Sequence, residues 1–131
     1  MKKILLISTG GTIASMPTDE GLTPKINSKK LLEYLNFTKL DFEIDTVNLL
    51  NVDSTDMQPE HWLKIKDEIK KNYEKYDGFV ITHGTDTMAY TASALSYLIQ
   101  NSQKPIVLTG SQKSIDMHIT DAKNNLLNSL L

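Results

Sequence analysis

Short apolar runs alternate with helical patterns along the chain, and this alternation limits the possible folds more than any other feature. An apolar run with little polar interruption is typical of a strand buried on both faces of a sheet. Runs of this kind cover residues 2–7, 78–82 and 105–109, while residues 42–50 begin with an apolar/polar alternation that also predicts a strand. The helical patterns cover 29–35, 59–76, 87–100 and 121–131. The alternation of strands and helices predicts an α/β domain with a mostly parallel sheet and helices on both faces. We expect a single such domain over residues 1–131.

Capping residues indicate where the helices begin. Asn27 or Ser28 is expected to cap the first helix, and Thr120 the last. Pro59 suits the first turn of the second helix, which has one apolar face at spacings of three and four. That face comprises Trp62, Ile65, Ile69, Tyr73 and Tyr76. The segment 15–25 holds one glycine and two prolines, and we expect a polar loop there.

Composition excludes several classes of protein. The 131 residues carry a formal net charge of −2, so no basic excess suggests a nucleic-acid surface. The apolar runs are far shorter than the roughly 18 residues of a membrane span. The chain has no cysteine, which excludes disulfides and thiolate chemistry. We expect a cytoplasmic protein with neither a nucleic acid nor a membrane as partner.

Small polar residues follow each apolar run, at the point where the strand should end. In open α/β sheets, ligands bind outside the carboxyl ends of the strands. The residues expected at that edge are Thr9, Gly10, Gly11 and Thr12; Asp53, Ser54, Thr55 and Asp56; Thr82, His83, Gly84, Thr85, Asp86 and Thr87; and Thr109, Gly110, Ser111 and Gln112. This set is rich in hydroxyls and carboxylates, so it is the candidate functional site.

The residue types at this edge suit acyl transfer. A threonine hydroxyl attacks a carbonyl only when a base removes its proton, and Asp86 beside Thr85 is a candidate for such a relay or for binding a positive group. Backbone N–H groups near Gly11 and Gly84 are placed to stabilise an oxyanion. Taken singly, each glycine–threonine pair also fits an ordinary tight turn with a capping hydroxyl. A phosphate site is the main rival, but no established phosphate-binding motif is present.

Two long motifs together resemble the active-site signatures of bacterial-type L-asparaginases. They are Thr9–Ala14 (TGGTIA) and Asp77–Met88 (DGFVITHGTDTM), and Asp53–Met57 (DSTDM) resembles the substrate-binding turn between them. Met88–Leu95 (MAYTASAL) and Leu108–Gln112 (LTGSQ) are most similar to the cytoplasmic type I branch. The resemblance implies a Rossmann-like three-layer fold and covers essentially the whole chain, as the N-terminal portion of such an enzyme.

The resemblance also implies hydrolysis of L-asparagine to L-aspartate and ammonia through a β-aspartyl ester. Thr12 would be the nucleophile, with Thr85 on the reacting side of the amide. Asp86 would hold the substrate's α-ammonium group. Ser54 would receive the α-carboxylate, and the other residues expected to line the pocket are Gly11, Asp53, Thr55, Gly84 and Ser111. No cofactor or metal is implied.

The family pattern extends beyond this chain. It places a lysine of the relay and a second domain after Leu131, and it implies a homodimer or homotetramer at full length. Many members carry a tyrosine in the loop over the site, where this chain reads Gly21-Leu22-Thr23. The 131 residues alone are therefore expected to be inactive. An amidotransferase subunit that releases ammonia for glutaminyl-tRNA shares both motifs, but an extra N-terminal domain is expected there. A non-catalytic module that binds a small amino acid is a third interpretation.

Overall fold

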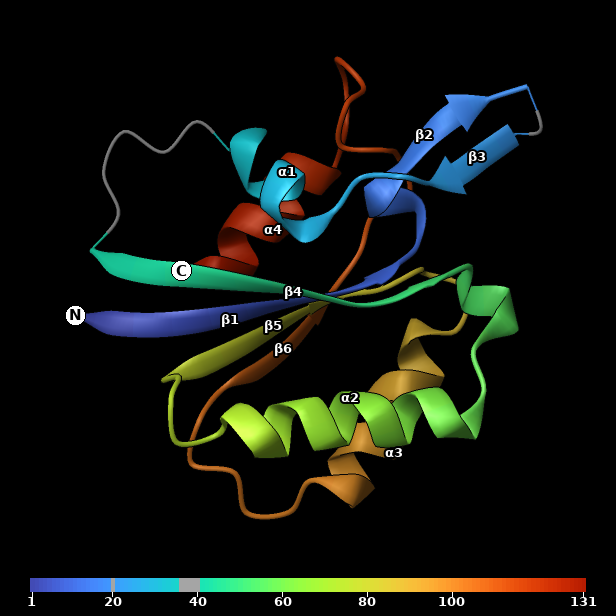
Figure 1. Ribbon diagram of the computed structural model, residues 1–131. Coiled ribbons are helices and arrows are strands. Elements are labelled where there is room, and N and C mark those ends of the chain that lie inside the picture. Colours follow the sequence, from blue (N-terminus) through green and yellow to red (C-terminus); the bar gives the residue numbers. More distant parts are fainter. Residues whose placement is uncertain (20, 36–40) are drawn as a thin grey trace.

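Four parallel strands form the central sheet, in the order β4-β1-β5-β6 (Figure 1). The structure is a computed structural model that describes residues 1–19, 21–35 and 41–131. The strands are β1 (Lys2–Gly10), β4 (Phe42–Val52), β5 (Gly78–Thr82) and β6 (Ile106–Thr109). Ser8 pairs with Thr82, and Thr82 pairs with Thr109, so three strands end at the same edge. The predicted parallel sheet is confirmed.

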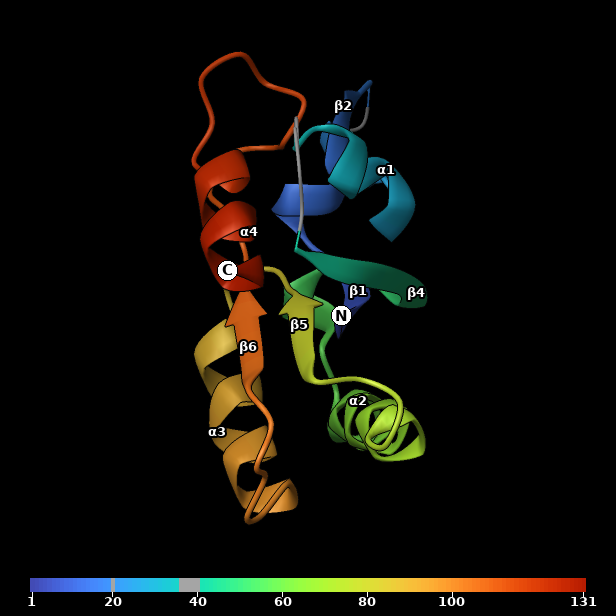
Figure 2. The same ribbon diagram turned by 90° about the vertical axis from the view of Figure 1, so that its left-hand side faces the viewer.

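Helices cover both faces of this sheet, as predicted (Figures 1 and 2). Helices α1 (Ser28–Glu33) and α4 (Ala122–Leu130) lie on one face, while α2 (Pro59–Asn72) and α3 (Met88–Leu98) lie on the other. Side chains of a strand alternate between faces. Leu6 therefore packs in the core under α1 and α4, and its neighbours Leu5 and Ile7 pack in the core under α2 and α3. Burial on both faces explains why the central strands β1 and β5 are largely continuous apolar runs, whereas the edge strand β4 alternates with exposed polar residues.

The segment expected to be a polar loop contains a hairpin instead. Strands β2 (Ser15–Thr18) and β3 (Gly21–Pro24) pair antiparallel and rise above the end of the sheet where β1 finishes (Figure 1). The Thr18 hydroxyl donates to the Gly21 carbonyl at 2.7 Å, and Gly21 has a φ of 105° that suits the turn. Residue 20 of the expected loop lies outside the described residues. The two prolines did not prevent pairing, because both strands are edges.

Helix ends follow the predicted caps with two corrections. Asn27 is the N-cap of α1, and its side chain accepts the Lys30 N–H at 2.9 Å. The N-cap of α4 is Asp121 rather than Thr120, although the Thr120 hydroxyl accepts the Ala122 N–H at 3.0 Å. Tyr76 lies beyond the end of α2 and packs edge-on against Phe79. Across the described part of the chain, no helix combines the length and apolar character that crossing a bilayer requires.

Candidate functional site

A small polar cavity of about 120 Å³ lies at the carboxyl ends of the sheet strands. It is the place where the predicted site residues come together. Its lining includes the predicted Gly11, Thr12, Asp53, Ser54, Gly84, Thr85 and Asp86, and also Ser15 and Gln112. Thr12 begins a short 3₁₀ turn directly after β1, and Thr85 and Asp86 follow β5 before α3 starts. The topology of a parallel sheet therefore gathers segments that are distant in the sequence around one cavity.

Close backbone packing between strand ends builds this cavity. Gly11 has a φ of 81°, and a Cβ there would lie 2.5 Å from the Gly84 Cα. A Cβ on Gly84 would lie 2.5 Å from the Ser54 Oγ. Both distances are far below van der Waals contact, so only glycine fits at either position. The segments after β1 and β5 therefore meet backbone to backbone, and the Ser54 side chain after β4 packs directly on Gly84, which brings the neighbouring side chains into one small space.

Hydroxyl groups on both sides of the cavity hold these ends together. The Thr9 hydroxyl donates to the Thr82 carbonyl at 2.7 Å, and the Thr87 hydroxyl donates to the Ser54 carbonyl at 2.6 Å. Both bonds join segments that are distant in the sequence. They fix the β1 end to the β5 end, and the β5–α3 loop to the turn that follows β4.

Two of the nine residues that were assigned a role in the site do not line the cavity. Thr55 turns its hydroxyl to the Asp53 carboxylate at 2.9 Å, within the turn after β4. Ser111 is buried, and its hydroxyl donates to the Lys113 carbonyl. Gln112, the next residue, lines the cavity instead. Residues 111 and 112 both follow β6 closely, so the sequence indicated the segment but not which side chain reaches the cavity.

Ser15 is the one lining residue that the sequence analysis did not place at this edge. Its hydroxyl donates to the Gly11 carbonyl at 2.8 Å. It directly follows the 3₁₀ turn that begins at Thr12, and it is also the first residue of the unexpected β2–β3 hairpin. A serine four residues after Gly11, able to return a hydrogen bond to the turn, was the available signal.

Charge in the cavity comes from two carboxylates. Asp53 and Asp86 are exposed, whereas Thr12 and Thr85 are half-buried. A pair of carboxylates beside neutral hydroxyls and backbone groups favours a ligand with a positive end, such as an ammonium group. Over the ranges that the structure describes, no group of three or more His, Cys, Asp or Glu side chains is arranged to hold a metal ion.

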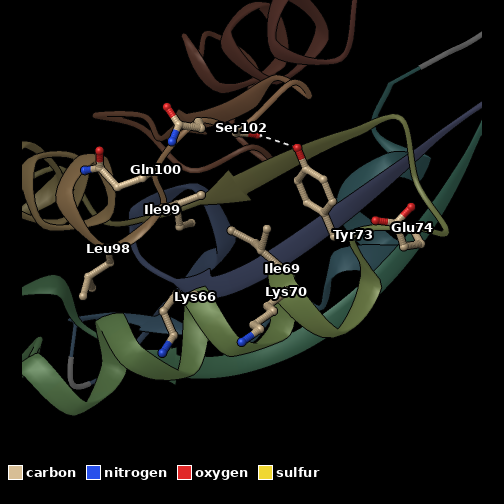
Figure 3. A pocket seen from close by; sticks show the side chains of 10 residues that line it. Lys66, Ile69, Lys70, Tyr73, Glu74, Leu98, Ile99, Gln100 and Ser102 are labelled. Carbon is tan, nitrogen blue, oxygen red and sulfur yellow. Dashed lines mark hydrogen bonds between the residues drawn. The ribbon is translucent and has the colours of Figure 1, made fainter.

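A larger cavity of about 640 Å³ lies away from this edge, between the C-terminal half of α2 and the end of α3 (Figure 3). Lys66, Ile69 and Tyr73 line it from α2 and its C-cap, and the Tyr73 hydroxyl lies 3.1 Å from the Ser102 Oγ. None of the predicted site residues borders it. Size alone therefore does not identify the site, because the hydroxyls and carboxylates converge in the smaller cavity.

We expect Gly84→Ala to lower the free energy of unfolding by about 1–3 kcal/mol, the usual cost of forcing extra volume into a packed site. The new methyl group would collide with the Cβ and Oγ of Ser54, which lie at 2.6 and 2.5 Å from its ideal position. Urea denaturation of the protein at its native length measures the change.

The double variant Gly84→Ala/Ser54→Gly is the matched control, because it removes both colliding atoms. In a double-mutant cycle with both single variants, the double variant should be at least about 1 kcal/mol more stable than the sum of the two single effects predicts. Strictly additive effects would contradict the proposed collision.

Similarity to known proteins covers nearly the whole chain. The chain matches the family model described as "Asparaginase, N-terminal" over residues 3–131. It is 44% identical to an L-asparaginase of Thermococcus kodakarensis over 98% of this chain and 39% of the relative. It is 43% identical to L-asparaginase 1 of Escherichia coli, with the same two shares. A glutamyl-tRNA(Gln) amidotransferase subunit of Sulfolobus acidocaldarius is 42% identical over 98% of this chain and 30% of the relative.

Solved structures show the same fold. The structure of the thermostable L-asparaginase from Thermococcus kodakarensis superimposes with a TM-score of 0.90 at 43% identity, over 98% of this chain and 39% of that one. A probable cytoplasmic L-asparaginase from Campylobacter jejuni gives a TM-score of 0.80 at 32% identity, over 99% and 39% of the two chains. The chain thus spans about 39% of the length of these L-asparaginases.

Proposed function

The chain belongs to the asparaginase family, and on that premise we propose that it is the N-terminal part of an L-asparaginase that releases ammonia from the side-chain amide of L-asparagine. The observation that carries this proposal is the small polar cavity. It brings the hydroxyls of Thr12 and Thr85 together with the carboxylate of Asp86. Two hydroxyls and one carboxylate are the groups that nucleophilic cleavage of an amide and recognition of an amino acid require.

Thr12 is the proposed nucleophile. Its Oγ attacks the side-chain carbonyl carbon, and the tetrahedral intermediate collapses as the C–N bond breaks. The hydroxyl proton of Thr12 ends on the leaving nitrogen, which departs as ammonia. Water then cleaves the β-aspartyl ester, which restores Thr12 and yields L-aspartate. Backbone N–H groups beside Gly11 and Gly84 are the proposed donors to the oxyanion, since both glycines line the cavity.

The α-ammonium and α-carboxylate groups of the substrate are proposed to bind to Asp86 and Ser54. Asp86 is proposed to pair with the α-ammonium, and the exposed position of its carboxylate leaves it open to an incoming ligand. Ser54 is proposed to donate to the α-carboxylate. Its side chain is buried beside Gly84 and lines the same cavity as Asp86.

The complete enzyme is proposed to be a cytoplasmic homo-oligomer. The length of the related L-asparaginases, of which this chain covers 39%, supports a further part of the protein beyond these residues. The relative from Campylobacter jejuni described as cytoplasmic supports the location. The match leaves most of the amidotransferase relative uncovered as well.

An amidotransferase subunit is the second candidate, because one relative of that kind matches at 42% identity over 98% of this chain. Ammonia release from the native-length protein distinguishes the two functions. We expect free L-asparagine to yield ammonia and L-aspartate in a purified assay without RNA. Release that requires a partner subunit and misacylated tRNA would favour the amidotransferase, and binding of L-aspartate without ammonia release would favour a non-catalytic module.

A further inference from the structure

A buried hydrogen-bonded chain connects α2 and α3 with the end of β5. The indole Nε1 of Trp62 on α2 donates to the Oγ1 of Thr91 on α3 at 2.9 Å. The same Oγ1 lies 2.8 Å from the Nε2 of His83, which directly follows β5. The Nδ1 of His83 lies 2.6 Å from the Gly84 carbonyl oxygen. His83 and Thr91 are fully buried, and His83 does not line the cavity.

The partners of the chain determine which ring nitrogen carries the proton. A carbonyl oxygen only accepts, so the Nδ1 of His83 must hold a hydrogen and donate it to Gly84. The indole N–H only donates, so it occupies a lone pair of the Thr91 hydroxyl. The hydroxyl hydrogen is then free to point at the Nε2 of His83, which accepts it in the neutral ring. The donation therefore runs in one direction, from Trp62 through Thr91 and His83 to Gly84.

The neutral ring is also the form that its surroundings favour. Burial lowers the pKa of His83 below its ordinary value, and the hydrogen bond to the Gly84 carbonyl opposes this only in part. Within such a chain each bond polarises the next. The imidazole is therefore held in one tautomer and one orientation.

The Gly84–Thr85 peptide is the group that this ring holds. The backbone N–H of His83 donates to the Thr109 carbonyl at 2.9 Å, so His83 itself is anchored to β6. Gly84, the next residue, has a backbone without a side chain to restrict it. A planar trans peptide whose carbonyl faces the imidazole must direct the N–H of Thr85 the opposite way. This peptide plane sets the direction of the Thr85 N–H, and the backbone of Thr85 and Asp86 continues from it.

We propose that His83 is a positioning residue: as the neutral Nδ1–H tautomer, supported by Thr91 and Trp62, it sets the orientation of the Gly84–Thr85 peptide and thereby places Thr85 and Asp86 in the cavity. This inference rests on the proposed function for its kinetic consequences. His83 touches neither substrate nor reacting atoms, and it acts through the peptide that it holds.

Two substitutions at His83 separate positioning from packing. In His83→Asn the side-chain NH₂ occupies the place of Nδ1 and still donates to the Gly84 carbonyl, whereas in His83→Gln the amide reaches toward the place of Nε2. We expect His83→Gln to lower kcat for L-asparagine about tenfold, with KM changed less than about threefold, because misplacement of a reacting group has effects of this order. We expect His83→Asn to retain at least about half of the wild-type kcat. Equal losses in the two variants would overturn the proposal.

Nitrogen-15 NMR of the histidine rings in the native-length protein tests the tautomer directly. We expect the Nδ1 of His83 to be protonated and the Nε2 to be bare. Thr91→Val, which removes the hydroxyl but keeps the shape, should leave the Nδ1 protonated, because the Gly84 carbonyl still accepts from it, and should lower kcat about threefold because the ring loses its second partner. Thr91→Val also serves as the alternative kinetic test if the His83→Gln protein does not fold. A proton on Nε2 in the wild type would overturn the proposal.

Failure of the proposed function is distinguishable from failure of this inference. A wild-type protein that releases no ammonia would refute the amidohydrolase function only. The dissociation constant for L-aspartate, measured by calorimetry in the same variants, would then decide the inference. His83→Gln should weaken binding several-fold relative to His83→Asn, and identical constants would overturn the proposal.

Discussion

Replacing Thr12 by alanine is expected to abolish ammonia release from L-asparagine. The loss should be at least about a thousandfold in kcat, because removing a catalytic nucleophile leaves only binding and oxyanion stabilisation to accelerate the reaction. Thr12 lies half-buried at the cavity, close to the buried end of β1. Its side chain is not part of either hydrophobic core, so the variant should fold. A coupled assay for ammonia with the purified native-length protein measures the change.

Thr12→Ser is the matched control, because it keeps the hydroxyl and loses only a methyl group. It should retain measurable turnover, while Thr12→Ala should not. Thr85→Ala is expected to be inactive as well, since the second hydroxyl belongs to the same cavity. Circular dichroism and thermal unfolding of each variant establish that the fold is kept. Near-normal turnover in Thr12→Ala would contradict its role as nucleophile.

Replacing Asp86 by asparagine is expected to weaken substrate binding strongly. Truncating one partner of a charge pair that becomes desolvated costs about 2–5 kcal/mol. The Asp86 carboxylate is exposed without substrate, so it is shielded from water only when a ligand covers it. We therefore expect the lower end of this range, a rise in KM of roughly 30-fold, from the conversion of about 1.4 kcal/mol per factor of ten.

Asp56→Asn provides the control for charge alone. Asp56 is an exposed carboxylate in the turn after β4, and it does not line the cavity. Asp56 has the same charge as Asp86, and asparagine is the isosteric replacement in both variants. Asp56→Asn therefore reports the general effect of removing one negative charge. KM should change less than about twofold in this variant. If Asp86→Asn behaved like Asp56→Asn, the proposed pairing with the α-ammonium group would be wrong.

Most of the fold was predictable because it depends on local patterns. Each of the segments 2–7, 42–50, 78–82 and 105–109 overlaps a strand of the sheet, since burial on both faces gives continuous apolar runs and an edge strand such as β4 gives an alternation. The hairpin of β2 and β3 was missed because its strands are short and contain prolines. Their pairing depends on turn geometry at Gly21 and on hydrogen bonds of Thr18, which no periodicity reveals.

The location of the candidate site was predictable from the sequence, but not every residue that lines it. Residues after each strand were expected at one edge, and seven of the nine that we had singled out line the cavity, with Thr55 and Ser111 the exceptions. Those two also follow strands directly in the sequence. Their hydroxyls, however, donate hydrogen bonds to the Asp53 carboxylate and the Lys113 carbonyl. Which of two adjacent side chains points inward depends on the backbone dihedral angles of the loop. The hydrogen bonds of the folded loop decide it.

The amino-acid sequence by itself determined the alternation of strand and helix, the family, and the edge of the sheet at which Thr12, Thr85 and Asp86 would meet. These follow from hydrophobic periodicity and contiguous motifs, which are local properties of the chain. Only the tertiary structure decided that Gln112 and Ser15 border the cavity, and that Trp62, Thr91 and His83 form one directed hydrogen-bonded chain. Trp62 and Thr91 are 29 residues apart. Such contacts exist only after α2 and α3 pack side by side on the same face of the sheet, because burial then forces each polar atom to find its partner.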